Sequence, residues 1–530
     1  MKIYRSFSLF VFLMCLPVLA QESPFSFKFE ESPASVSATT SENPASNSTS
    51  AMLVQGDTIW LGTSRGLSRS TDKGQTWRNY YGDPAFGTEN ISAIAWDKYR
   101  GIIWVATAHS VVRTGQTLPE GSGLRWSSDG GETWNKVAQP LDANGDTVIV
   151  YGANRLRALP VTVAVQNITY DIAITPGAVW IASFAGGLRK STDLGATWQR
   201  VILPPDYLNS VKPTDVLDFC VSPVPGNFCS EGYLNYRAFS VMATSDSVIY
   251  AGTANGINKS TDGGISWVKY NHQNQVNAMS GNFVVGLGHK PGTNEIWAAT
   301  WKAEDQDEFY GVSFSPDGGA NWITSLEGER VNNFAVFTDK VVAAASGGLY
   351  KSNDYGKTWY SPGNIVDSQT KLSLKTATFY SAAWAESGIV LYVGTADGLV
   401  KNSGFTGVWP DQWKLYFASQ ALESREDSYA FPNPFSPKTE QVKIKYSTGG
   451  KELDVTIRIF DFGMNYVRTV IQNARRGNPT HVVNSGDNGG VIDFWDGKDD
   501  NGKIVPNGVY FYRIDAGGEK PMFGKIMVLQ

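Results

Sequence analysis

The stretch Ser70-Thr-Asp72-Lys-Gly74-Gln-Thr-Trp77 contains the pattern Ser-x-Asp-x-Gly-x-x-Trp, and this octapeptide returns along the chain. Five further copies keep all four defining residues, whereas a seventh has decayed to Asn402, Gly404, Thr406 and Trp409. Repetition of one motif predicts an architecture built from repeated units. The aspartate and tryptophan of the strict copies are Asp72 and Trp77, Asp129 and Trp134, Asp193 and Trp198, Asp262 and Trp267, Asp317 and Trp322, and Asp354 and Trp359.

Each copy of the octapeptide lies in the same local pattern. A short apolar run such as Thr58–Gly62 precedes it, and a second run leads directly into the motif after a turn. Another apolar run, for example Ile91–Ala95, comes before this pair, and a last strand starts at the Trp. Short apolar runs separated by Gly-containing turns are typical of antiparallel strands. Each unit therefore predicts four strands in meander order.

The octapeptide has the chemistry of a hairpin between the third and fourth strands. Its Asp carboxylate can accept hydrogen bonds from N–H groups of its own turn. Its Gly supplies a position with positive φ, and its Trp buries a large apolar area between neighbouring sheets. We therefore interpret the six aspartates as structural residues rather than as catalysts.

The repeats set the fold class. Seven units between residues 51 and 420 leave about 53 residues for each, which fits a four-stranded sheet with its loops. Radial packing of such sheets gives a β-propeller, because closure protects most strand edges. Abundant Gly and Trp also disfavour long helices. The sequence predicts an all-β protein, a seven-bladed β-propeller followed by a small Ig-like β-sandwich.

The octapeptide resembles the Asp-box (bacterial neuraminidase, BNR) repeat of sialidases, sortilin-type receptors and xyloglucan hydrolases. The resemblance implies the propeller fold and is much less specific for activity. Sialidases carry an Arg-Ile-Pro motif ahead of the boxes, and none occurs here; the nearest stretch is Arg157–Pro160. The xyloglucan hydrolases place their carboxylates between two propellers, whereas this chain has repeats for one.

The N-terminal region predicts export. A positive start, an apolar run from Phe7 to Leu16 and small residues up to Ala20 predict a signal peptide over residues 1–20. Residues 21–50 are rich in Ser, Thr, Ala, Pro and Asn, so we expect a flexible linker. No later run is long and apolar enough for a transmembrane segment. The net charge of −5 provides no bulk basicity for binding nucleic acid.

Two cysteines remain after the predicted cleavage. Cys220 and Cys229 flank a Pro- and Gly-containing loop. Exported proteins favour disulfides, so we expect a disulfide between them, with two unrelated buried thiols as the alternative.

Three insertions are candidates for a functional site. They cover Ala108–Gly123, Ile202–Phe239 and Trp301–Tyr310, and in a propeller all three should rise on the face opposite the octapeptides. His109 in the first insertion is a candidate acid or base.

The other two insertions combine aromatic and acidic side chains. Trp301, Tyr310, Tyr233 and Tyr236 are candidates for carbohydrate binding by stacking on sugar rings. The candidates for a catalytic carboxylate pair or a Ca²⁺ site are Glu304, Asp305, Asp307 and Glu308. We favour the simpler interpretation, a hydrated acidic loop whose aromatic residues pack on their own hairpin, because adjacent carboxylates in a loop are usually just hydrated.

A second domain follows a linker at residues 421–428. Residues 429–530 contain alternating strands and two motifs, Pro432-Asn-Pro-Phe435 and Trp495-Asp-Gly-Lys-Asp-Asp-Asn-Gly502. The strand spacing predicts an Ig-like β-sandwich. Three carboxylates of the second motif are weak candidates for Ca²⁺, although turn chemistry alone explains Asp496, Asp499 and Asp500.

The two motifs together resemble the Ig-like domain of the flagellar hook-cap protein and the type A C-terminal sorting domains of type IX secretion cargo. This resemblance implies a type IX-like secretion machinery as partner and a secreted or cell-surface location in a Gram-negative bacterium. We expect an interaction module for a glycan or a surface protein, without a cofactor and without nucleic acid. The alternative is a glycoside hydrolase that uses carboxylates of the 301–310 insertion.

Overall fold

The computed structural model describes residues 39–41, 43–303, 306–368, 373–374, 376–385, 388–404, 407–418, 422, 426–438, 441–477 and 490–530. The predicted signal peptide, Glu304 and Asp305 lie outside the described residues. The regular secondary structure of the described part consists of strands and one short 3₁₀ helix, η1 (Leu234–Tyr236). In that part, no helix is long and apolar enough to span a bilayer.

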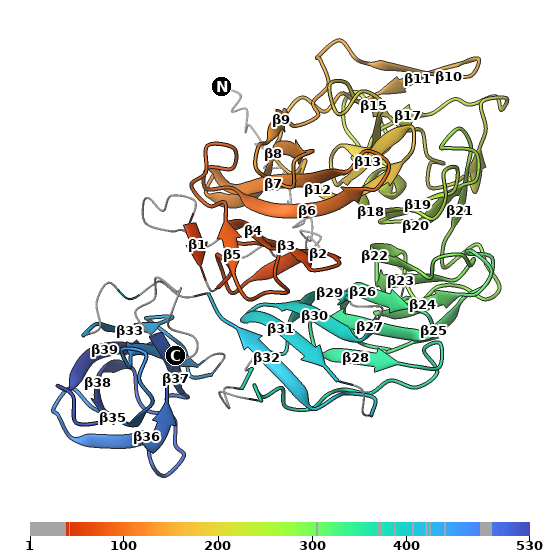
Figure 1. Cartoon of the computed structure of the whole chain (residues 1–530). Coiled ribbons are helices and arrows are strands. Elements are labelled where there is room, and N and C mark those ends of the chain that lie inside the picture. Colours follow the sequence, from red (N-terminus) through yellow and green to blue (C-terminus); the bar gives the residue numbers. More distant parts are fainter. Residues whose placement is uncertain are drawn as a thin grey trace, which may run out of the picture.

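Seven successive antiparallel sheets account for most of the region from residue 49 to residue 416 (Figure 1). The first three contain β2 (Thr49–Gln55), β3 (Thr58–Thr63), β4 (Gly66–Ser70) and β5 (Trp77–Asn79); β6 (Asn90–Asp97), β7 (Ile102–Arg113), β8 (Gln116–Ser127) and β9 (Asn135–Val137); and β12 (Thr169–Thr175), β13 (Ala178–Ser183), β14 (Gly187–Ser191) and β15 (Gln199–Arg200).

The remaining four sheets repeat this meander order. They contain β18 (Ala238–Ala243), β19 (Ile249–Thr253), β20 (Gly256–Ser260) and β21 (Trp267–Tyr270); β22 (Phe283–His289), β23 (Ile296–Trp301), β24 (Gly311–Ser315) and β25 (Ile323–Ser325); β26 (Val331–Phe337), β27 (Lys340–Ala345) and β28 (Leu349–Ser352); and β29 (Phe379–Ala385), β30 (Val390–Thr395), β31 (Gly398–Ser403) and β32 (Gln412–Tyr416).

The sheets follow one another around a ring. The first strand of each sheet contacts the first strand of the next, and β29 contacts β2. Asn47 joins the start of the ring to its last sheet. Its C=O accepts the N–H of Gly398 and its Oδ1 accepts the N–H of Ala418, both at 2.6 Å. Every sheet also has a β-bulge near the start of its first strand. The arrangement is a propeller-like ring.

The expected linker at residues 21–50 is corrected at its end. β1 (Thr39–Ser41) pairs with β5 as an additional outer strand, and Ser46 and Thr49 are buried. Hydroxyl groups replace apolar packing here: the N–H of Ala45 donates to Ser68 Oγ, and Ser46 Oγ bonds Ser64 Oγ at 2.6 Å. A polar composition therefore does not exclude order where a sheet edge offers hydrogen-bond partners.

The long 202–239 connection also differs from the expectation, because it covers the outer rim of the ring. β16 (Ser210–Val211) pairs with the outer strand β21, and β17 (Cys220–Val221) pairs in parallel with β11 (Asn154–Ala158). β11 itself forms a hairpin with β10 (Val148–Tyr151), at the periphery of the ring in Figure 1. The insertion thus supplies short strands that pair with edge strands at the rim of the ring. The expected disulfide between Cys220 and Cys229 is confirmed.

The C-terminal domain packs two sheets on one core. One contains β33 (Ser428–Phe431), β34 (Val442–Ser447) and β37 (Gly490–Trp495); the other contains β35 (Leu453–Phe460), β36 (Tyr466–Arg476), β38 (Gly508–Ala516) and β39 (Met522–Val528).

Both faces of β34 are buried, because it also contacts the seventh sheet of the ring. Lys443 Nζ forms an ion pair with Asp397 Oδ1 at 2.7 Å and lies over the Phe417 ring. Ile492 and Phe494 of the adjacent strand β37 pack on the same core of the ring. The C-terminal domain is therefore anchored to the ring by charged and apolar contacts.

Candidate functional site

The six strict octapeptides, called boxes below, form one repeated hydrogen-bond network. In the first box, Ser70 Oγ donates to Asp72 Oδ1 at 2.7 Å and accepts the N–H of Gly74 at 2.8 Å. Asp72 Oδ1 accepts the N–H groups of Gln75 and Thr76, and its Oδ2 accepts the Thr76 hydroxyl. The same Ser-to-Asp and Gly-to-Ser bonds recur in the other five strict boxes. These carboxylates are thus engaged in their own turns.

This network also keeps the Asp carboxylates of the boxes ionised. The Thr197 hydroxyl, followed by the Thr197 N–H and the Ser191 hydroxyl, lowers the pKa of Asp193 to about 2. Bonds from Thr358 and Ser352 likewise lower the pKa of Asp354 to about 2. A carboxylate held ionised in this way is a poor proton donor at neutral pH, which agrees with a structural role.

Each box also contacts the preceding sheet. Tyr250 OH donates to the C=O of Gly318 at 3.2 Å, and Tyr392 OH donates to the C=O of Lys73 at 3.0 Å. A Cβ on Gly264 would lie 2.3 Å from the Trp180 ring, so this close approach requires glycine. In these three contacts, the partner of the box is an aromatic residue in the second strand of the preceding unit. This residue is visible in the sequence, but reasoning from the octapeptide alone did not identify it as a contact.

The acidic 301–310 insertion does not present a described carboxylate pair. Glu308 is buried, and its two oxygens accept the Gln273 amide, the Asn282 amide, and the N–H groups of Asn282 and Ala303. Asp307 is exposed and already has an interaction partner. Glu308 therefore anchors the insertion to the preceding connection.

The four aromatic candidates fall into two separate groups. Trp301 is 8% exposed and donates its Nε1–H to the C=O of Val331, while Arg330 lies over the rings of both Trp301 and Tyr310. Tyr233 and Tyr236 are buried in the core beneath the rim insertion, where Tyr236 OH donates to the C=O of Leu203. The structure therefore does not bring the two groups into one sugar-binding surface.

His109 lies between two carboxylates that reasoning from the sequence did not identify. Its Nδ1 is 2.9 Å from Glu89 Oε2, and its Nε2 is 3.3 Å from Glu120 Oε2. Glu120 faces His109 because β7 and β8 pair these two residues directly, and Glu89 also accepts the Ser122 hydroxyl at 2.6 Å. The three side chains are 38%, 22% and 20% exposed for His109, Glu89 and Glu120.

His109, Glu89 and Glu120 thus form a cluster of titratable side chains outside the boxes. However, the imidazole fills the space between the carboxylates, where a glycosidase holds the scissile bond and a water molecule. Ser122 donates to Glu89 and not to His109, so the arrangement also differs from a nucleophile paired with a histidine base.

The three carboxylates of the C-terminal motif do not converge on a cation. Asp499 Oδ1 accepts the N–H groups of Asn501 and Lys503, and Asp500 Oδ2 accepts the Tyr466 hydroxyl. Asp496 forms ion pairs with Arg468 and Lys498. Across the chain, apart from the undescribed segments, no group of three His, Cys, Asp or Glu residues could hold a metal ion.

Comparison with known proteins supports the fold. No family model matches the chain, and no curated protein matches its sequence. An ancestral GH74 enzyme is similar with a TM-score of 0.51 and 14% identity, covering 93% of this chain and 64% of that one. The WD40 β-propeller domain of Doa1 has a TM-score of 0.40 and 9% identity, covering 67% of this chain and 92% of the domain.

PorZ, a surface component of the type-IX secretion system of Porphyromonas gingivalis, is also similar, with a TM-score of 0.31 and 14% identity over 90% of this chain. The chain spans 64% of the length of both the GH74 and the PorZ chains. At these identities the similarity concerns the fold, an all-β propeller, and carries no activity or partner.

Proposed function

We propose that this chain is an exported seven-bladed Asp-box propeller that acts as a binding module at the cell surface or outside the cell. A C-terminal Ig-like domain delivers it through a type IX-like secretion machinery of a Gram-negative bacterium. The observation that carries the proposal is the shared core of the two C-terminal motifs. Phe435 of the first motif contacts Trp495 of the second at 5.8 Å between ring centroids, and Trp495 contacts Tyr510 at 5.4 Å.

Contacts between the first motif and the last strand support the same proposal. Asn433 Oδ1 accepts the N–H of Met527, and Asn433 Nδ2 donates to the C=O of Lys525. The first motif thereby fixes the last strand, β39. Two distant motifs and the C-terminal strand form one structural unit, as expected if the combination is recognised as a whole.

Export is tested by fusing residues 422–530 to a reporter with a signal peptide, in a host with a type IX system. We expect the reporter to become accessible to protease added to intact cells. A matched fusion with Trp495→Ala, which removes the centre of the shared core, should remain in the periplasm. Equal export of both fusions, or of neither, would contradict the delivery proposal.

Binding without catalysis is tested separately on the whole purified protein. We expect a glycan or surface-protein array to reveal a ligand, and a screen of glycoside substrates to show no turnover. The alternative is a glycoside hydrolase that uses carboxylates of the 301–310 insertion, in which Asp307 is exposed. Turnover that disappears in Glu120→Gln or Asp307→Asn, and persists in the exposed control Asp339→Asn, would replace the binding proposal.

A further inference from the structure

The hairpin of β10 and β11 leaves one strand edge free at the rim of the ring. The strand order β10–β11–β17 places β10 at the edge of its sheet. The N–H of Ala158 donates to the C=O of Thr147 at 2.9 Å, so Thr147, and with it Ile149 and Tyr151, direct their backbone groups toward β11. Val148 and Val150 therefore direct their N–H and C=O groups outward. Among the described residues, neither forms a backbone bond on that side.

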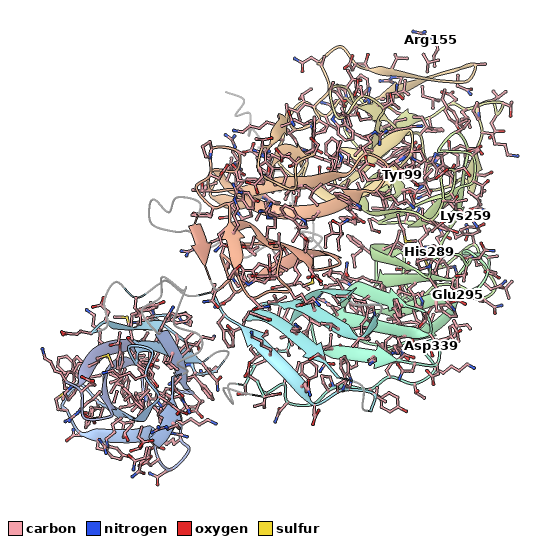
Figure 2. The ribbon with its side chains drawn as sticks, viewed as in Figure 1. Tyr99, Arg155, Lys259, His289, Glu295 and Asp339 are labelled. Atoms are coloured by element: carbon pink, nitrogen blue, oxygen red, sulfur yellow. A yellow bond between two sulfur atoms is a disulfide. The ribbon has the colours of Figure 1, made fainter. Side chains whose placement is uncertain are left out.

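The side chains along this edge are apolar and basic. Val148 is 43% exposed and Val150 is 65% exposed. Their partners across the hairpin are Arg157 and Arg155, which share the same outward face because directly paired residues point to the same side. Figure 2 shows Arg155 at the outer periphery, and within the described chain it forms no ion pair. Arg157 lies over the Phe228 ring.

This edge is held rigidly. Tyr151 OH donates to the C=O of Ile265 at 2.7 Å, and Asn154 Nδ2 donates to the C=O of Asp215 at 2.8 Å. A Cβ on Gly152 would lie 2.0 Å from the carbonyl oxygen of Pro213, so the turn packs directly on the rim insertion.

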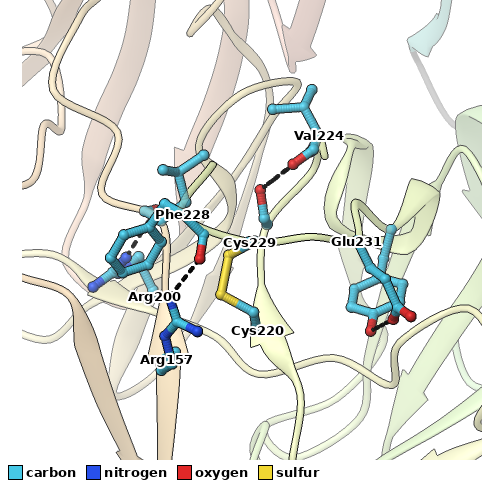
Figure 3. The surroundings of a disulfide bond; sticks show 10 residues. Arg157, Arg200, Cys220, Val224, Phe228, Cys229 and Glu231 are labelled. Atoms are coloured by element: carbon cyan, nitrogen blue, oxygen red, sulfur yellow. Dashed lines mark hydrogen bonds between the residues drawn. A yellow bond between two sulfur atoms is a disulfide. The ribbon is translucent and has the colours of Figure 1, made fainter. Parts of the chain in front are cut away.

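The disulfide secures the third strand of this sheet. Cys220 lies in β17, which pairs with β11, and Figure 3 shows the bond from Cys220 to Cys229 beside Arg157 and Phe228. A strand fixed before binding loses little conformational entropy on association. Edge strands are normally protected by Pro, Lys or a bulge, and residues 148–151 contain none of these.

We propose that β10 is a docking edge for an extended peptide of a partner protein, whose acidic side chains alternate with apolar ones. The partner strand would pair with the free backbone groups of Val148 and Val150, in the mode of strand addition. Because β10 would separate this strand from β11, its acidic side chains on the outward face would extend over Val148 and Val150 toward Arg157 and Arg155, and charge complementarity selects an acidic partner over a basic one. The inference rests on the proposed binding function and names the class of its ligand.

The probe is a labelled heptapeptide that alternates glutamate with valine, compared with its lysine counterpart by fluorescence anisotropy. We expect the full-length protein to bind the glutamate peptide at least about tenfold more tightly. Arg155→Glu should abolish this preference, because Arg157 and the new carboxylate then offset each other, whereas Arg113→Glu, at an exposed hairpin tip elsewhere on the ring, should leave it unchanged. Equal binding of the two peptides, or an unchanged preference in Arg155→Glu, would overturn the proposal.

A second variant tests the backbone. Val150→Pro removes one outward N–H and should weaken binding of the glutamate peptide by about tenfold, while Val150→Thr should retain it. If sedimentation shows dimers that Val150→Pro dissociates, a second copy occupies the edge and the peptide proposal is wrong. Absence of binding to either peptide also overturns it. The export fusions and the ligand array test the proposed export and binding functions, and their outcome does not depend on β10.

Discussion

The octapeptide turns and the β10–β11 hairpin use polar groups in opposite ways. In each box, a carboxylate and a hydroxyl are engaged by groups of the same turn, as in the bonds from Thr76 to Asp72. At the rim hairpin, the outward backbone groups of Val148 and Val150 have no such bonds in the described structure. Polar groups that satisfy each other stabilise a scaffold, whereas free groups on a rigid support are available to a partner. Repetition in the sequence therefore marks the scaffold, and the candidate docking edge lies outside the repeats.

The largest expected effect concerns the tryptophans of the boxes. Trp267 is 1% exposed, so Trp267→Ala should lower the free energy of unfolding by about 3–5 kcal/mol through the cavity that it leaves. Val150→Ala at the rim should change it by less than about 0.5 kcal/mol. Denaturant unfolding measures both, and similar losses would remove the distinction between scaffold and edge.

The disulfide should stabilise the rim rather than the ring. Replacing Cys220 and Cys229 together by Ser should cost about 2–4 kcal/mol in the local stability of the insertion, because the open loop gains conformational entropy. Hydrogen exchange should show faster opening of β11 and β17 and little change in β22 and β23. Faster exchange throughout the ring would show that the rim insertion supports the whole fold.

Removing one box carboxylate should have a smaller effect. Asp72→Ala deletes the acceptor of two N–H groups and two hydroxyls and should cost about 1–2 kcal/mol, similar to the loss of a helix N-cap. Asp72→Asn keeps one oxygen acceptor and should cost less. A loss of ligand binding by Asp72→Asn without a change in stability would instead assign this box to a functional site.

The pH dependence of stability should reflect the same carboxylates. The pKa of Asp193 and of Asp354 is lowered to about 2 in the folded chain, below the value near 3.9 of an unfolded Asp. Their contribution is therefore complete above about pH 4 and is lost as the pH falls from about 4 to about 2. Asp193→Asn combined with Asp354→Asn should reduce this acid dependence in thermal unfolding, and an unchanged profile would contradict the assigned roles.

The repeats predicted the all-β class because the motif carries its own turn chemistry. The Ser, Asp and Gly of each box form hydrogen bonds within their own turn. The disulfide was also predictable, because its cysteines close a short loop in an exported chain.

The rim sheet and the acid cluster were not predictable in this way. β11 pairs with β17, and residues 157 and 220 are far apart in sequence. Glu120 reaches His109 through the pairing of β7 with β8, and Glu89 reaches it because β6 pairs with β7, with Asn90 opposite Ala108. Order at Ser46 depends on a hydroxyl of the neighbouring loop at Ser64. These features depend on pairing between residues that are far apart in sequence, and such pairing cannot be read from local composition.

The most direct test is amide hydrogen exchange of the full-length protein with and without the glutamate–valine peptide. The N–H groups of Gly74 and Thr76, bonded at 2.8 Å to Ser70 Oγ and Asp72 Oδ1, should exchange slowly in both samples. The N–H groups of Val148 and Val150 should exchange rapidly in the free protein and slowly with the peptide. Slow exchange of Val148 and Val150 without peptide, or no slowing on its addition, would contradict the account.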